Sequence, residues 1–284
     1  MDITFWGTRG SIAAPGRDTL TYGGNTTCLE VTLSSGRTVI VDAGTGIRCL
    51  GTSIMERQLP LDLDLIITHI HWDHIMGFPF FAPVYQESAT IRVDGCRRAI
   101  TGLKNVFASA FVDGTWPIKF DDLRAKIEPV ESLLETMPGG RRIDDTEIRQ
   151  HRLHHPQGGI GLRFSESGGS FVFLTDNELS DDGWKGASFD DFVEFCRGAD
   201  VLVHDCQYFP EEMPLRKGWG HSDSESVARL AVESGIGKLY LFHHDPWRKD
   251  DDVAIMVGRC RDALDRLGAV VEVEGAREGD QIKI

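Results

Sequence analysis

The chain has 284 residues and a formal net charge of −14, from 30 Lys plus Arg against 44 Asp plus Glu. Apolar residues make up 41% and charged residues 26%, the balance of an ordinary globular protein. No segment approaches the ~20 apolar residues of a membrane span, and residues 1–6 lack the features of a secretory signal. The six cysteines are scattered without a C-x-x-C pair, which argues against a disulfide framework or a cysteine-rich zinc site and suits a reducing cytoplasm.

Strand patterns fill the first third of the chain, and strands alternate with helices after it. The predicted strands are 3–5, 28–33, 38–41, 61–67, 170–174, 201–203 and 239–242. The predicted helices are 189–196, 222–234 and 253–267. Ser222 and Glu225 predict a capping box for the second helix, and Gly235 predicts its C-cap. With no repeat or linker, this order favours two sheets with helices outside, in one domain over residues 1–284.

Most of the ten histidines follow directly on a predicted strand. The densest group, H-x-H-x-D-H, follows strand 61–67 and supplies four metal-binding side chains within six residues: His69, His71, Asp73 and His74. A lone buried histidine is more often a hydrogen-bonded core residue, but four such groups at this spacing reverse that preference. Imidazoles and carboxylates suit zinc, manganese or iron. We predict a metal centre in which His69 and His71 serve one ion and Asp73 and His74 a second.

At this motif the sequence resembles the metallo-β-lactamase-fold hydrolases. The segments 5–11 (FWGTRGS), 22–31 (YGGNTTCLEV) and 42–46 (DAGTG) resemble the opening of the branch that contains ribonuclease Z and the cyclic-phosphate phosphodiesterases. The resemblance implies an α/β fold, a four-layer αββα sandwich with a dinuclear site at one edge of its paired sheets. It also implies two divalent metal ions, zinc in the first place, with manganese or iron as alternatives.

The resemblance implies a set of seven ligands, which are His69, His71, Asp73, His74, His155, Asp176 and His243. His155 is preferred because Gly161 opens an apolar strand six residues later; His151 and His154 stay open as competitors. Asp176 closes strand 170–174, and its carboxylate would bridge both metals. His243 is preferred to its neighbour, although His244 stays open.

Two further motifs favour phosphodiester chemistry. They are Val203-His204-Asp205-Cys206 and Gly220-His221-Ser222-Asp223. In the ribonuclease Z branch, a His–acidic motif and a His–Ser motif occupy these positions, which implies that Asp205 orients His221 toward the leaving group. A carboxylate-held histidine is a suitable proton donor near neutral pH. The simpler alternative is that His221 only caps the helix that follows it.

The resulting functional prediction is a dinuclear metal-dependent phosphodiesterase that acts on a small or cyclic phosphodiester. We expect a metal-bound hydroxide, steered by Asp73, to attack phosphorus while His221 protonates the departing oxygen. One alternative is a metal-dependent lactonase or thioesterase of the same fold, which would not need the Asp205–His221 pair. A second is a nonenzymatic binding or regulatory module.

The spacing between two motifs shapes the expected partners. In ribonuclease Z the arm that grips tRNA is commonly inserted between the third and fourth metal motifs, whereas only 21 residues separate His155 from Asp176 here. With the charge of −14, we expect a small-molecule substrate, no stable nucleic-acid binding and no membrane partner; a homodimer is left open. Trp116, Asn25 and Thr26 are the predicted substrate contacts.

Overall fold

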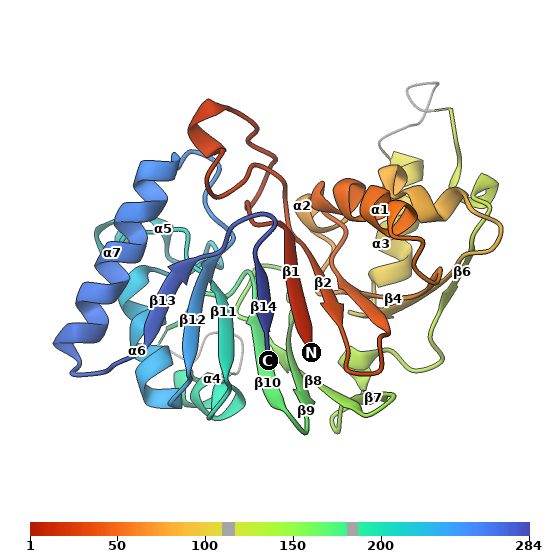
Figure 1. Ribbon diagram of the computed structural model, residues 1–284. Coiled ribbons are helices and arrows are strands. Elements are labelled where there is room, and N and C mark those ends of the chain that lie inside the picture. Colours follow the sequence, from red (N-terminus) through yellow and green to blue (C-terminus); the bar gives the residue numbers. More distant parts are fainter. Residues whose placement is uncertain (110–116, 181–186) are drawn as a thin grey trace.

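Two seven-stranded sheets face each other in the computed structural model, which describes residues 1–109, 117–180 and 187–284 (Figure 1). The first has the order β14 (Gln281–Lys283), β1 (Asp2–Gly7), β2 (Cys28–Thr32), β3 (Thr38–Val41), β4 (Asp62–Ile67), β5 (Thr90–Gly95) and β6 (Lys126–Pro129). The second has the order β13 (Glu272–Gly275), β12 (Lys238–Phe242), β11 (Val201–Asp205), β10 (Gly169–Leu174), β9 (Ile160–Glu166), β8 (Thr146–Arg152) and β7 (Arg141–Ile143).

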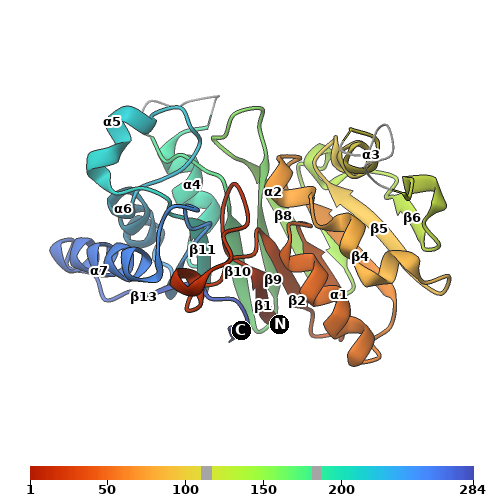
Figure 2. The same cartoon turned by 90° about the horizontal axis from the view of Figure 1, so that it is seen from above.

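Helices cover the outer face of each sheet (Figure 2). The first sheet is covered by α1 (Gly46–Glu56) and α3 (Ala99–Ser109), and the second by α4 (Phe189–Cys196), α6 (Ser224–Ser234) and α7 (Asp250–Arg266). The short helices α2 (Trp72–Ile75) and α5 (Met213–Arg216) follow β4 and β11. This arrangement confirms the predicted αββα sandwich. Among the described residues, no helix is long and apolar enough to cross a membrane.

Strand β4 shows how the layers are built. Leu63, Leu65 and Ile67 point into the apolar layer between the first sheet and its helices. Ile66 points the other way, into the layer between the two sheets. The sequence predicted one strongly apolar face for this strand, but both faces are buried because the second sheet covers the opposite one. Asp64 is tolerated there because it forms ion pairs with two arginines.

The start of α6 differs from the predicted capping box. The helix begins after Asp223, whose carboxylate accepts a hydrogen bond from the amide of Glu225 at 2.9 Å. Ser222 is fully buried, and its hydroxyl donates to the carbonyl of Asn177 at 2.6 Å. The predicted cap is therefore wrong by one residue, because the tertiary contact takes the Ser222 hydroxyl. Gly235 is confirmed as the left-handed C-cap, with φ 63°.

Parallel pairing brings the strand ends of the site to one edge. Strands β10, β11 and β12 run parallel to one another, and so do β3, β4 and β5. Their carboxyl ends therefore lie at one edge of each sheet, and the chain turns there into the segments that carry the histidines. The chain ends pair at the other end of the first sheet, where the Met1 amine donates to the Ile284 carbonyl at 3.0 Å (Figure 1).

Candidate metal centre

Seven histidine and aspartate side chains converge at this edge in two overlapping groups. The open cluster consists of His69, His71, His155 and Asp176. The buried cluster consists of Asp73, His74, Asp176 and His243. Within each cluster, one ligand atom per residue lies within 4.8 Å of all the others. Asp176 belongs to both clusters.

The Asp176 carboxylate has one oxygen toward each cluster. Its Oδ2 lies 3.6 Å from Nε2 of His69 and 3.6 Å from Nε2 of His155. Its Oδ1 lies 3.1 Å from Nε2 of His74 and 3.1 Å from Nε2 of His243. The backbone of Asp176 takes a left-handed turn, with φ 51°, directly after β10. This placement is what a carboxylate shared by two metal ions requires.

The chemistry of these groups fits divalent metal ions. The buried Nε2 atoms of His69 and His74 have no hydrogen-bond partner among the described residues, which is unusual for buried nitrogens. Burial lowers the pKa of His69 and brings that of His155 to about 4, so both rings are neutral near pH 7, which is the form that binds a metal. Although burial alone would raise the pKa of Asp176, His243 and His74 hold it well below its usual value.

Side chains and one amide from outside the set hold the buried cluster. The contacts are Asp42 Oδ2 with His74 Nδ1 at 2.8 Å, the Ser11 amide with Asp73 Oδ2 at 2.7 Å, and Gln207 with His243 Nδ1 at 2.8 Å. Such contacts fix the ring orientation of a metal-binding histidine. Asp42 lies in the DAGTG segment and Ser11 in the FWGTRGS segment noted in the sequence, whereas no motif pointed to Gln207.

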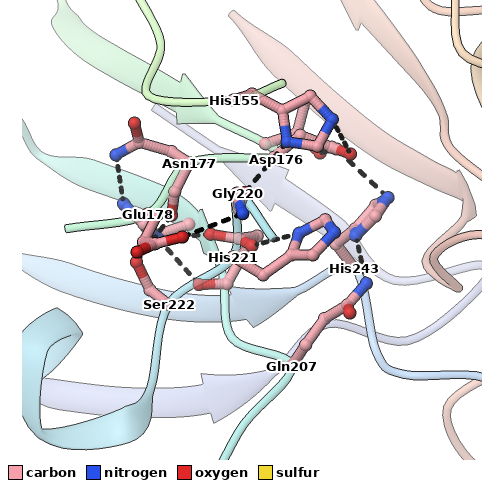
Figure 3. A network of polar contacts seen from close by, with 12 residues as sticks. His155, Asp176, Asn177, Glu178, Gln207, Gly220, His221, Ser222 and His243 are labelled. Atoms are coloured by element: carbon pink, nitrogen blue, oxygen red, sulfur yellow. Dashed lines mark hydrogen bonds and ion pairs between the residues drawn. The ribbon is translucent and has the colours of Figure 1, made fainter. Parts of the chain in front are cut away.

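The open cluster is held mainly by a folded loop. The ring of His155 donates from Nδ1 to the carbonyl of Gly220 at 3.0 Å (Figure 3). The carboxylate of Glu178 accepts the amides of Gly218 and Gly220, at 2.8 and 2.9 Å, and so fixes this loop. At Gly220, with φ 88°, a Cβ would collide with the His155 ring, which explains the glycine. Sequence reasoning missed Glu178, because nothing local marks its partners.

The predicted pair of Asp205 and His221 is formed. His221 Nδ1 lies 2.9 Å from Oδ2 of the fully buried Asp205, and the His221 ring stacks on His243 with centroids 5.2 Å apart. Burial alone would lower the pKa of His221, but the hydrogen bond that its ring donates to Asp205 and the nearby charge of Asp176 raise it. The alternative role as a helix cap is not seen, since Asp223 caps α6. His221 lies 7% exposed beside both clusters.

The competing histidines lie elsewhere. Each of them contacts a backbone carbonyl through one ring nitrogen. The distances are 3.1 Å for Nδ1 of His154, 2.9 Å for Nε2 of His244 and 2.9 Å for Nδ1 of His151. The cluster geometry therefore favours His155 and His243 over their neighbours.

The predicted substrate contacts are not brought to the clusters. The Asn25 side chain donates to Glu278 at 2.9 Å. Thr26 is fully buried, and its hydroxyl accepts the amide of Thr45 at 2.8 Å. Both side chains serve the loop that precedes β2, because these partners occupy them. Trp116 lies outside the described residues.

The fold and this site together define a metal-dependent hydrolase. Residues 37–244 match the family model of the beta-lactamase superfamily domain, so the chain belongs to the beta-lactamase superfamily. The Ribonuclease Z of Lacticaseibacillus casei is 26% identical, over 96% of this chain and 94% of that protein. Human tRNase Z, short form, has a similar structure with a TM-score of 0.67 and 21% identity, covering 100% and 99% of the two chains. The metallo-beta-lactamase fold protein YhfI of Bacillus subtilis reaches 0.69 at 19% identity, covering 99% and 98%.

The relatives correct one expectation. The chain was expected to have no stable nucleic-acid binding, on the grounds of its charge of −14 and the 21-residue spacing. That expectation is wrong, because relatives aligned over nearly the whole chain are named as ribonucleases. The physical reason is that a net charge summed over 284 residues does not describe the local field at a site.

Proposed function

We propose that residues 1–284 form one phosphodiesterase domain whose active site is the pair of clusters around Asp176. The single observation that carries the proposal is the Asp205–His221 pair, buried against two clusters that share one carboxylate. Metal clusters alone suit many hydrolyses, but a carboxylate-held histidine beside them supplies the proton that a departing alkoxide needs. The pairing of β14 with β1 supports a single domain, since the last strand completes the first sheet.

In this proposal one divalent ion is held by His69, His71, His155 and Asp176, and the other by Asp73, His74, Asp176 and His243. Imidazole and carboxylate ligands favour zinc, with manganese or iron as alternatives. When bound, two such ions supply Lewis-acid polarisation of the phosphoryl oxygens and lower the pKa of an attacking water.

The chain's own residues perform the remaining steps. Asp73 orients the attacking water on the side of the buried cluster, where the Ser11 amide donates to its carboxylate. His221, held at Nδ1 by Asp205, donates the proton from Nε2 to the oxygen that leaves phosphorus. Because Asp205 is fully buried, its charge is little screened by water and stabilises the protonated ring of His221.

The first candidate substrate is a small or cyclic phosphodiester. Its support is that the described chain between His155 and Asp176 forms only a turn and strands β9 and β10, without a further arm. The names of the relatives favour a second candidate, an RNA phosphodiester. Both candidates place the same diester chemistry at the same residues.

A substrate panel with metal analysis tests the proposal. The protein, purified without chelator, is assayed on bis-p-nitrophenyl phosphate, cyclic nucleotides, an RNA oligonucleotide, a lactone and a thioester. We expect two metal ions per chain and turnover of phosphodiesters above that of the other esters. Turnover of the lactone or thioester without any diester, or at most one metal ion in metal-replete protein, would overturn it.

Two histidines on one segment provide a matched control for the metal assignment. His155→Gln removes a member of the open cluster, whereas His151→Gln changes a histidine of β8 that contacts the rings of Phe192 and Phe195. We expect the first variant to lose metal and activity and the second to keep both. Equal losses in the two variants would contradict the assignment.

A further inference from the structure

A cavity of about 630 Å³ opens beside the open cluster, and most of its lining residues are not metal-ligand candidates. His69 and His71 form part of its wall. The rest is formed by the segment between β5 and α3, the short turn that contains Glu135, the end of β8 and the start of β9 with the loop before it. A diester bound at the clusters therefore has one of its arms next to this cavity. The cavity is large enough for a small molecule.

The charge of this cavity is opposite to that of the protein. Three arginines, Arg97, Arg98 and Arg152, line it against a single acidic residue, Glu135. The protein as a whole has a net charge of −14, so a cavity lined by three cations and one anion differs in charge from the rest of the molecule. The side chains of Gln150 and Gln157 add neutral hydrogen-bonding groups to the same walls.

These arginines are not used to hold the described structure together. Within residues 1–109, 117–180 and 187–284, none of the three guanidinium groups forms an ion pair, whereas most arginines elsewhere in that part do. Glu135 uses one carboxylate oxygen to accept the backbone amide of Arg97 at 2.6 Å. All three arginine side chains are exposed. They therefore remain able to bind a ligand.

The arrangement selects a phosphate. A planar guanidinium donates paired hydrogen bonds to oxyanions, and several of them around one cavity suit a group with several charged oxygens. Arg97 and Arg98 follow β5 of the first sheet, directly before α3, and Arg152 is the last residue of β8 in the second sheet. Arginines from both sheets therefore line the same cavity.

We propose that this arginine cavity binds a second phosphate of the substrate, next to the diester that is cleaved. The inference rests on the proposed phosphodiesterase function and names its substrate class: diesters that carry a further phosphate. That phosphate is either the free terminal phosphate of a small molecule or the next linkage of an oligonucleotide. The bonds broken are those of the proposed hydrolysis, and the arginines contribute binding only.

Three thymidine diesters test this. The first compound is thymidine p-nitrophenyl phosphate. The second also carries a free phosphate on the other sugar hydroxyl of thymidine. In the third compound that hydroxyl is joined through a phosphate to a second thymidine, so the second phosphate is a linkage. Both arrangements of the 3′ and 5′ positions are made. We expect kcat/KM to rise about tenfold or more with the second phosphate, the size of one good charged hydrogen bond. If kcat/KM rises for the second compound but not for the third, the cavity binds a terminal phosphate. If kcat/KM rises for the second and the third compound, the cavity binds the next linkage of an oligonucleotide.

The variants R97Q/R98Q and R152Q should remove most of this gain while leaving the first compound unchanged. The matched control is R259Q/R266Q, which removes the same charge from α7, where both arginines form exposed ion pairs with glutamates. The control should keep the gain. No gain in the wild-type protein, or a gain that survives both cavity variants, would overturn the proposal.

Binding to metal-free protein separates the two proposals. Thymidine 3′,5′-bisphosphate is titrated calorimetrically into chelator-treated protein, and R97Q/R98Q is expected to weaken its binding about tenfold. If this holds while no diester is hydrolysed, the phosphate site stands and the proposed reaction falls. If diesters are hydrolysed but bisphosphate binding does not depend on the arginines, the reaction stands and the phosphate site falls.

Discussion

The open and buried clusters share Asp176 but are built differently. In the buried cluster every ligand is buried, and its histidines are held by the side chains of Asp42 and Gln207. In the open cluster His71 is partly exposed, and His69 and His71 line the arginine cavity. Its His155 contacts a backbone carbonyl through Nδ1, and its His69 contacts the hydroxyl of Thr68 at 3.1 Å.

This difference assigns the clusters different duties. Side-chain carboxylates and amides that contact a metal-binding histidine fix its orientation and tune its basicity. The ligands of the buried cluster are therefore held in fixed orientations, and we expect the attacking water to be oriented there. The open cluster, with its cavity wall, is the side on which the substrate enters and on which specificity is decided. Substitutions that affect the two clusters unequally test this comparison.

The largest effect is expected where the clusters meet. Asp176→Ala removes an oxygen from each cluster and leaves four histidine nitrogens without the charge that faces them. We expect loss of both metals and a fall in kcat/KM on the order of 10³-fold or more, above that of any single histidine substitution. Elemental analysis beside bis-p-nitrophenyl phosphate turnover measures it. Near wild-type turnover and metal content would show that the carboxylate does not bridge.

The next effect tests the residue that touches both clusters. His221→Ala should keep two metals and much of the activity on a p-nitrophenyl ester, because p-nitrophenolate leaves without protonation. On an alkyl or ribose diester it should lose at least ~10²-fold, the usual contribution of a general acid. Asp205→Asn should follow the same pattern more weakly. The measured quantity is the ratio of the two losses in metal-loaded protein.

Two other results would assign His221 differently. Equal losses on both esters would make it a substrate-positioning residue. Loss of metal would mean that His221 helps to hold a metal ion. The geometry allows this, because Asp205, His221 and His243 also have ligand atoms within 4.8 Å of one another.

A paired substitution separates the clusters themselves. Asp42→Asn removes the charge that contacts His74 Nδ1 directly and His69 only through the hydroxyl of Thr68. We therefore expect metal affinity to fall about 10- to 100-fold at the buried cluster and less at the open cluster. Glu178→Gln loosens the loop behind His155 and should weaken the open cluster instead. Competition with a chelator, followed as two release steps, measures both. If each variant weakens both steps equally, the clusters are one cooperative unit.

The sequence predicted four of the cluster members from a local signal, and the resemblance implied the other three, His155, Asp176 and His243. Alternation marked β4, and H-x-H-x-D-H places four side chains at its end whatever the rest of the chain does. Asp205 and His221 were also marked by short motifs, and the structure places them 2.9 Å apart. The resemblance supplied the αββα order, which periodicity alone did not distinguish from other mixed folds.

Other features depend on contacts between distant segments and could not be predicted from local pattern. Glu178 meets Gly218 and Gly220 across 40 and 42 residues, and the Ser11 amide meets Asp73 across 62 residues. Net charge failed for a related reason, since the sum over the chain hides the arginine cavity. Asn25 was predicted from a turn at which a phosphate could bind, but Glu278 from the far end of the chain occupies it.

The smallest effect is expected at Gln207, which no motif marked and which contacts Nδ1 of His243. When His243 binds a metal through Nε2, its Nδ1 carries the proton and needs an acceptor, which the amide oxygen of Gln207 supplies after a half-turn of the amide. Gln207→Leu removes that acceptor. A neutral hydrogen bond contributes about 1 kcal/mol, so metal affinity at the buried cluster should fall about fivefold, less than in Asp42→Asn. Gln207→Glu keeps an acceptor and should restore or raise the affinity, because a carboxylate makes the ring a stronger ligand. Chelator competition on the two variants measures this. A loss in both, or a loss at the open cluster, would mean that Gln207 supports the packing beside β11 rather than the orientation of His243.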